Sequence, residues 1–152
     1  MLFRSIRAGV GATHKTIEAS ILRQMTVENE PQIYGDSTEI KIVPLDDFID
    51  ENPTLIKLDV EGAEVDALIG AARMLRQCRP KIFIEVHTQF IGKFGYNLTD
   101  LFLAIPSDIY DIKLKVARID RQWRTYRPGE EVGVTVPLLI YATPKLAISG
   151  AD

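Results

Sequence analysis

Cysteine is nearly absent from this sequence of 152 residues, which contains neither a long apolar run nor a recognisable secretion signal. The single cysteine, Cys78, excludes an intramolecular disulfide framework and is typical of a reducing compartment. No uninterrupted apolar run approaches the roughly 18 residues that a membrane-spanning helix requires. The stretch before Thr16 lacks acidic residues, but it also lacks the apolar core of a secretion signal. We therefore expect a cytoplasmic protein with no membrane partner.

Charge of one sign is not in strong excess either. The net charge is -3, and the Lys and Arg residues are scattered rather than gathered in a stripe, which argues against a nucleic-acid partner. An apolar share of 46% beside a charged share of 26% is ordinary globular composition. The length allows one domain with one sizeable core.

The first 35 residues carry only weak patterns. Ile17, Ile21 and Met25 share one helical stripe, which is interrupted by Asn29 and by the Pro31 to Gly35 stretch. We interpret residues 1–35 as a poorly defined N-terminal segment, residues 36–147 as the main part of the domain, and residues 148–152 as a tail.

From Glu39 onward the pattern becomes regular. A short strand ends at Pro44, and Asp46 is the expected N-cap of a short helix after it. The next segment, Leu55–Asp59, is suited to a buried strand. A long amphipathic helix follows and ends before Pro80, because the residue before a proline is driven out of the helical region. Its apolar face consists of Val65, Leu68, Ile69, Ala72 and Leu75.

Three further strands and one helix complete the predicted order. Lys81–His87 is a second buried strand, and Asn97 caps the helix after it. Residues 112–116 and 136–142 are strands that no helix separates. Alternating strands and helices predict right-handed crossovers and an open α/β sheet with helices on both faces, and the last two strands predict an antiparallel hairpin at one edge. This ending is typical of the class I methyltransferase fold, a Rossmann-like sheet, by fold-level analogy.

Acidic residues gather where the two buried strands end. Ligands of open α/β sheets bind beyond the carboxyl ends of the strands. Asp59, Glu61 and Glu64 follow the first strand, although the helix dipole alone also explains an acidic Glu61 and Glu64. Glu85 and His87 end the second strand and are two residues apart, so they are expected on the same side of the sheet. If these strands are neighbours, Asp59, Glu61, Glu85 and His87 converge.

Such a cluster predicts catalytic roles for these four residues. His87 is the natural general base for a hydroxyl, because an unperturbed imidazole has a pKa closest to neutral pH. The carboxylates are candidates to orient a sugar hydroxyl, or to hold a Mg²⁺ ion that acidifies it. Glu64 and Trp123 are candidate substrate-binding residues, although the loop around Trp123 is also interpreted as a hairpin loop that covers an edge.

The stretch LIKLDVEGAEVDALIGAARML, with VPLDDFI before it and RPKIFIEVH after it, resembles the FkbM-type methyltransferases. The resemblance is strong over residues 40–87 and implies O-methylation of hydroxyls on sugars or natural products such as polyketides, with S-adenosylmethionine as cofactor. By position, Asp59, Glu61, Glu64 and Glu85 match the acidic motif residues of the family, and His87 matches the histidine that often follows. Residues 36–147 then correspond to the C-terminal part of the family's domain, with Asp59 also a candidate cofactor contact.

The beginning of the family pattern is not found upstream of Asp59. The pattern requires a strand, a glycine-rich loop for the cofactor, and an acidic residue for the ribose, and Gly9–Val10–Gly11 offers only two spaced glycines. Strand-and-crossover units of roughly 30 residues also need more than the 58 residues that precede Asp59. We therefore expect that the N-terminal strands are missing, that the chain is a fragment, and that the exposed edge of the Leu55–Asp59 strand promotes self-association.

Three functions follow from these patterns. The leading one is an S-adenosylmethionine-dependent O-methyltransferase that acts on a small hydroxylated acceptor and lacks the cofactor loop. The second is a non-catalytic fragment, or one subunit of a split methyltransferase. The third is an unrelated doubly wound binding domain with an acidic metal site.

Overall fold

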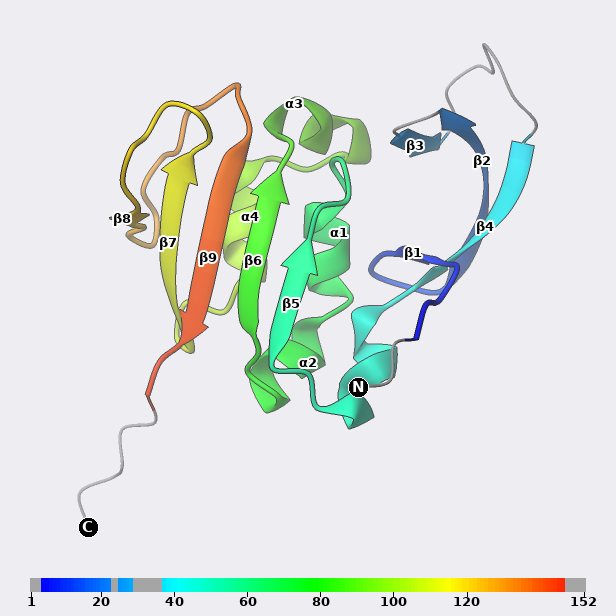
Figure 1. The fold of residues 1–152 in the computed structure, drawn as a ribbon, viewed down its shortest axis with the longest axis horizontal. Helices are drawn as coiled ribbons and strands as arrows, with labels where there is room; N and C mark the ends of the chain where they lie inside the picture. Colours follow the sequence, from blue (N-terminus) through cyan, green and yellow to red (C-terminus); the bar gives the residue numbers. More distant parts are fainter. Residues whose placement is uncertain (1–3, 23–24, 29–36, 147–152) are drawn as a thin grey trace.

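The structure is a computed structural model and describes residues 4–22, 25–28 and 37–146, with side chains outside residues 19–38. The described residues form a four-stranded sheet from the N-terminal part and a five-stranded sheet from the rest (Figure 1). The tail at 148–152, the interruption expected at Asn29 to Gly35 and the boundary placed after it all lie outside these residues. No helix among the described residues is long and apolar enough to cross a membrane.

The five-stranded sheet carries the acidic strand ends. Its strands are β5 (Leu55–Leu58), β6 (Lys81–Val86), β7 (Tyr110–Val116), β8 (Arg124–Thr125) and β9 (Leu138–Pro144). Their order is β5-β6-β9-β7-β8, with β5 and β6 parallel and β9 antiparallel to both of its neighbours. The two buried strands predicted from sequence are therefore adjacent and parallel. The antiparallel pairing of the last two long strands is confirmed, with β9 lying between β6 and β7.

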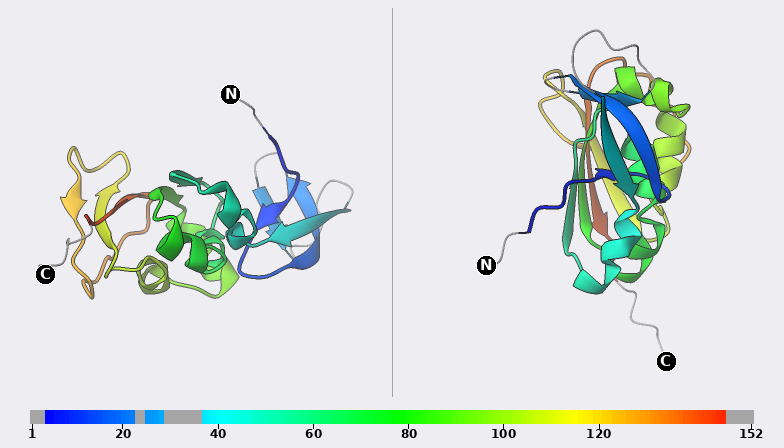
Figure 2. Two further views of the ribbon diagram at one scale, coloured as in Figure 1. Left: turned by 90° about the horizontal axis from the view of Figure 1, so that it is seen from below. Right: turned by 90° about the vertical axis from the view of Figure 1, so that its right-hand side faces the viewer.

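The helices lie on one side of this sheet rather than on both. They are α1 (Glu64–Ile69), α2 (Ala72–Gln77), α3 (Thr88–Ile91) and α4 (Leu98–Ala104), with 3-10 helices η1 (Leu45–Glu51) and η2 (Gly92–Phe94). Helices α1, α2 and α4 lie behind the strands in Figure 1 and on one side of them in Figure 2. The expectation of helices on both faces is wrong for the described residues. The two crossovers run in the same direction along the sheet, and right-handed crossovers of one direction place their helices on one face.

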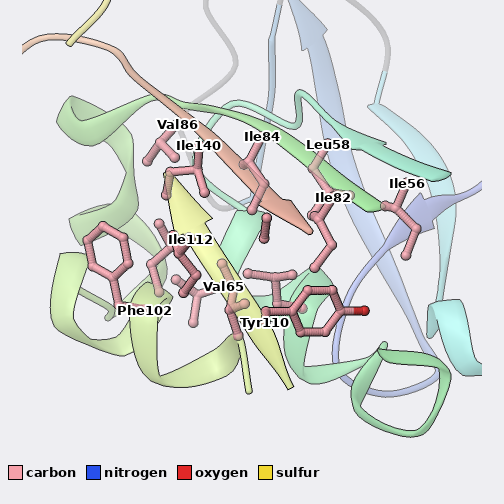
Figure 3. Close-up of a cluster of buried hydrophobic side chains, with 14 of the residues drawn as sticks. Ile56, Leu58, Val65, Ile82, Ile84, Val86, Phe102, Tyr110, Ile112 and Ile140 are labelled. Carbon is pink, nitrogen blue, oxygen red and sulfur yellow. The ribbon is translucent and has the colours of Figure 1, made fainter. Parts of the chain in front are cut away.

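Strand alternation explains which face the helices cover. Ile82, Ile84 and Val86 of β6 are fully buried, whereas Phe83 and Glu85 between them are only half-buried on the opposite face. The buried face of the sheet and the apolar stripes of α1, α2 and α4 enclose one core (Figure 3). Phe83 and Glu85 belong to the face without helices, which we call the open face.

The long helix predicted after β5 is broken at Gly70. Helix α1 ends at Ile69 and α2 begins at Ala72. A Cβ atom on Gly70 would lie 2.1 Å from the carbonyl oxygen of Gly11, so the segment that follows β1 packs directly on the break. Apolar periodicity passes through the break unchanged, which is why the sequence pattern predicts a single helix.

Asp46 caps a different helix from the one expected. It lies inside η1, whose N-cap is Pro44 without a side-chain hydrogen bond. The Asp46 carboxylate instead accepts hydrogen bonds from the backbone N–H groups of Arg73 at 3.1 Å and Met74 at 2.8 Å. These are free donors in the first turn of α2, so η1 supplies the cap that α2 lacks in its own sequence.

The N-terminal segment is a sheet and not a helix. Its strands are β1 (Gly9–Val10), β2 (Lys15–Leu22), β3 (Met25–Glu28) and β4 (Ser37–Val43), in the order β1-β4-β2-β3. The helical stripe predicted at Ile17, Ile21 and Met25 is wrong, because Ile17 and Ile21 lie in β2 and Met25 begins β3. A spacing of four also fits one face of a strand, whose side chains repeat every two residues.

Candidate active site

The turn after β5 has a strained backbone. Glu61 has a φ of 53° and Gly62 a φ of 108°, both in the region that L side chains rarely occupy. A Cβ atom on Gly62 would lie 2.8 Å from the Cβ of Phe90 and 2.9 Å from its carbonyl carbon, so α3 packs closely on the turn. Strain in a non-glycine residue such as Glu61 persists where the surroundings require it and is common at functional sites.

This turn brings acidic residues from β5 to the imidazole at the end of β6. His87 Nε2 lies 3.5 Å from Glu61 Oε2. One donor atom from each of Asp59, Glu61 and His87 lies within 4.8 Å of the other two. Asp59 is also paired with Lys57, whose Nζ lies 2.9 Å from its carboxylate. Three of the predicted site residues therefore lie together at the carboxyl ends of β5 and β6.

Glu64 lies beneath this group and is completely buried. Its Oε1 accepts a hydrogen bond from the Gly62 N–H at 3.1 Å and lies 3.6 Å from His87 Nδ1. Within the part of the chain that the structure describes, Glu64 Oε2 and His87 Nδ1 have no hydrogen-bond partner. Glu64 therefore lies against His87 from the interior of the protein, and its predicted role in substrate binding stays a prediction.

Glu85 does not join the group of three. It is half-buried on the open face, beside Leu139 of β9, and none of its oxygens meets the same 4.8 Å limit with all three members. The parallel pairing of Leu58 with Ile84 nevertheless makes Asp59 and Glu85 neighbours at the strand ends, so the convergence of all four residues stays a prediction. The alternation of β6 ends at Val86, and the backbone of His87, with ψ of 79°, leaves the strand. The His87 ring stacks on Phe90, a contact that no sequence pattern indicated.

Trp123 lies on the open face, in the connection between β7 and β9. Its ring makes edge contacts with Phe83 of β6 and Tyr141 of β9, each with ring centroids 6.4 Å apart, and 40% of the residue remains exposed. The connection therefore covers the outer edge of β7 through β8, as expected, and also packs Trp123 on the open face. Phe83 and Tyr141 were missed as partners, although the alternation of β6 places Phe83 and Glu85 on one side.

The grouped side chains at the strand ends have the chemistry of a cation site, whereas the glycines near the N-terminus are closely packed. Two carboxylates and an imidazole, from Asp59, Glu61 and His87, are ligands that divalent metal ions take. Gly9 and Gly11, by contrast, are packed against Ile42, with Cβ positions 2.6 and 2.7 Å from its side chain. A side chain at either position would clash with Ile42, so close packing accounts for both glycines.

A comparison with protein-family models finds one matching family. Residues 5–114, well over half of the chain, match the family model described as the methyltransferase FkbM domain. The crystal structure of Methyltransferase FkbM from Methylobacillus flagellatus KT is 27% identical, with a TM-score of 0.48, over 89% of this chain and 27% of that chain. This chain therefore spans about a quarter of the length of that relative. Among curated proteins no match is found.

Proposed function

Because this chain belongs to the FkbM methyltransferase family, we propose that it forms the acceptor side of an S-adenosylmethionine-dependent O-methyltransferase. The acceptor class that we propose is a hydroxyl of a sugar or a related natural product. The observation that carries this proposal is the grouping of Asp59, Glu61 and His87 donor atoms within 4.8 Å at adjacent strand ends. That position is where open α/β sheets bind their ligands.

The group has the chemistry that a hydroxyl acceptor requires. The hydroxyl must lose its proton as its oxygen becomes a nucleophile. We assign the acceptance of that proton to His87 Nε2, since this nitrogen makes no close hydrogen bond and the side chain is 13% exposed. Glu61, 3.5 Å away, stabilises the positive charge that the imidazole then carries. Asp59 accepts a hydrogen bond from a neighbouring hydroxyl of the acceptor.

The open face supplies a surface for the rest of the acceptor. Trp123, held by Phe83 and Tyr141, offers a partly exposed ring of the kind on which sugar rings pack. On the open face of β6, Glu85 comes one outward position after Phe83, about 6.6 Å further along the strand. A sugar-sized molecule that contacts Trp123 therefore also reaches Glu85. This order supports substrate-binding roles for Trp123 and Glu85.

We propose further that the loop that holds the methyl donor lies outside the described residues, with Asp59 as a contact at its boundary. Gly9 and Gly11 are occupied by packing against Ile42 and cannot serve as that loop. Calorimetric titration of the chain with S-adenosylmethionine tests this directly. We expect no saturable binding at millimolar donor, and micromolar binding would contradict the assignment.

A second role for the same donors is to hold Mg²⁺, which would acidify the bound hydroxyl. The 4.8 Å grouping of Asp59, Glu61 and His87 is the observation that favours it. Thermal unfolding of the wild type and of Glu61→Gln in up to about 10 mM Mg²⁺ separates the two roles. A Mg²⁺-dependent rise in Tm that occurs only in the wild type supports Mg²⁺ binding at this site. Identical unfolding curves with and without Mg²⁺ would rule it out.

The methyl-transfer role is tested in the native polypeptide that carries this sequence, with labelled S-adenosylmethionine and a panel of monosaccharides and polyols. His87→Gln should lower the rate by about 10²- to 10⁴-fold, the range for removal of a general base. His14→Gln is the matched control, because His14 is exposed and pairs only with Asp47. Equal rates in the two variants would refute the role of His87, and no transfer by the wild type would favour the non-catalytic alternative.

A further inference from the structure

Glu64 is an unusual carboxylate because it is fully buried yet incompletely bonded. Its Oε1 accepts the Gly62 N–H, which is the arrangement expected of an acidic residue at a helix start. Its burial is complete, however, and Oε2 has no hydrogen-bond partner. A buried carboxylate is costly unless it is paired, so the helix start alone does not explain this residue.

His87 shows the complementary deficiency. Its Nδ1 is buried without a hydrogen-bond partner and lies 3.6 Å from Glu64 Oε1. Its other ring nitrogen, Nε2, faces Glu61 at 3.5 Å on the more exposed side. The Phe90 ring lies nearly parallel to the imidazole, with the ring centroids 6.2 Å apart. The two nitrogens therefore face two different carboxylates, one fully buried and one partly exposed.

We propose that Glu64 is a positioning residue that holds His87 as the Nδ1–H tautomer. A neutral imidazole carries one N–H, and the hydrogen bond made by one nitrogen decides which nitrogen keeps the lone pair. An ionised Glu64 can accept a hydrogen bond from Nδ1–H. The Nδ1 to Oε1 distance of 3.6 Å has to shorten by somewhat less than about 1 Å for this bond to form. The Nε2 lone pair then faces Asp59 and Glu61. This inference rests on the proposed function, in which Nε2 receives the proton of the acceptor.

The difference in burial explains why Glu64, and not Glu61, sets the tautomer. The side chains of Glu61 and His87 are 35% and 13% exposed, and that of Glu64 is not exposed at all. Water competes for an exposed carboxylate, whereas a hydrogen bond to a buried one is strengthened by the low local dielectric. A protonated Glu64 would instead donate a hydrogen bond to Nδ1, and the imidazole N–H would then be on Nε2. The tautomer of His87 therefore also shows whether Glu64 is ionised.

Long-range ¹H–¹⁵N NMR of the full chain, labelled at histidine, reads the tautomer directly. The chain has two histidines, and His14 is the internal reference. His14 Nε2 lies 2.7 Å from Asp47 Oδ2, so its N–H belongs on Nε2. At about pH 9, where a free imidazole is neutral, we expect His87 to show the opposite pattern, with its N–H on Nδ1. An Nε2–H signal or a persistent imidazolium for His87 would overturn the proposal.

Two variants then test whether Glu64 is the cause. Glu64→Gln should shift His87 toward the Nε2–H form, and an unchanged spectrum would overturn the proposal. Asp66→Asn is the matched control. Asp66 lies on the same helix as Glu64, but its carboxylate accepts a hydrogen bond from the Tyr96 hydroxyl. This variant should leave the His87 spectrum unaltered. If Glu64→Gln does not fold, the wild-type tautomer decides alone. No measurement here involves methyl transfer, so a failure is distinguishable from failure of the proposed function.

Discussion

At the scale of single residues, Gly62 determines whether the acidic turn can approach α3. Its backbone has a φ of 108°, and a Cβ atom added to it would lie 2.8 Å from the Cβ of Phe90, which leaves no room for a side chain. We expect Gly62→Ala to lower the free energy of unfolding by about 2–3 kcal/mol. Gly92→Ala, at a position with φ of -61° and open space around it, should change it by less than about 0.5 kcal/mol. Urea denaturation measures both, and equal losses would contradict the close packing.

Tyr110 links stability to alkaline pH. Its hydroxyl lies 2.9 Å from the Pro80 carbonyl and 3.2 Å from the Leu75 carbonyl, and burial raises the pKa of Tyr110 from 10.0 to about 12. The folded state retains the proton more strongly than the unfolded state. The stabilisation is therefore complete below pH 10 and is lost as the pH rises toward 12.

Tyr110→Phe should accordingly lower the free energy of unfolding by about 1 kcal/mol at neutral pH. The difference between wild type and variant should shrink above pH 10, since ionisation of the wild-type phenol removes the same contribution. Denaturant unfolding at a series of pH values gives this difference. A value that stays constant up to pH 12 would show that the phenol is not held in its protonated form.

At the scale of elements, η1 and α2 are joined by one carboxylate. Asp46 accepts hydrogen bonds from two backbone N–H groups in the first turn of α2. We expect Asp46→Ala to cost about 1–2 kcal/mol, as for loss of an N-cap. Asp50→Ala, an exposed carboxylate at the other end of η1, is the matched control. Thermal unfolding compares them, and a loss in both variants of the same size would argue against a cap between elements.

Local sequence patterns predicted the elements that do not depend on contacts with distant parts of the chain. Strands β5 and β6 are short apolar runs buried on the helical face, and their burial follows from alternation alone. The break at Gly70 depends on Gly11, which is distant in sequence, so no local pattern contains it. The β2 segment was predicted wrongly because its apolar residues repeat every four positions, a spacing that fits both a helix and a strand.

The site was predictable to a similar extent. Asp59, Glu61 and His87 come together because parallel neighbouring strands end at one edge, a consequence of the strand order. Glu85 lies within β6 on the open face, whereas His87 follows the end of the strand, so alternation alone does not fix where the His87 side chain lies relative to Glu85. The complete burial of Glu64 was not foreseen, because an acidic residue at a helix start is usually at the surface.

At the scale of the whole molecule, β5 is the outer strand of the five-stranded sheet within the described residues. Leu55 at its start is 59% exposed. We propose that this edge pairs with a second chain, as unprotected apolar edges do. Light scattering at high concentration should show self-association that Leu55→Lys reduces. Leu103→Lys, at a leucine of α4 that is still more exposed, should not reduce it, and a monodisperse monomeric wild type would contradict the proposal.

We propose that the side chains at the ends of β5 and β6 act together to take the proton of a hydroxyl. A double-mutant cycle of methyl transfer with Asp59→Asn and His87→Gln, one residue from each strand end, tests it most directly. Residues that act on the same hydroxyl should be non-additive, so the double variant should lose little more than the worse single variant. Losses that simply multiply would show that Asp59 and His87 act independently, and the proposal would be refuted.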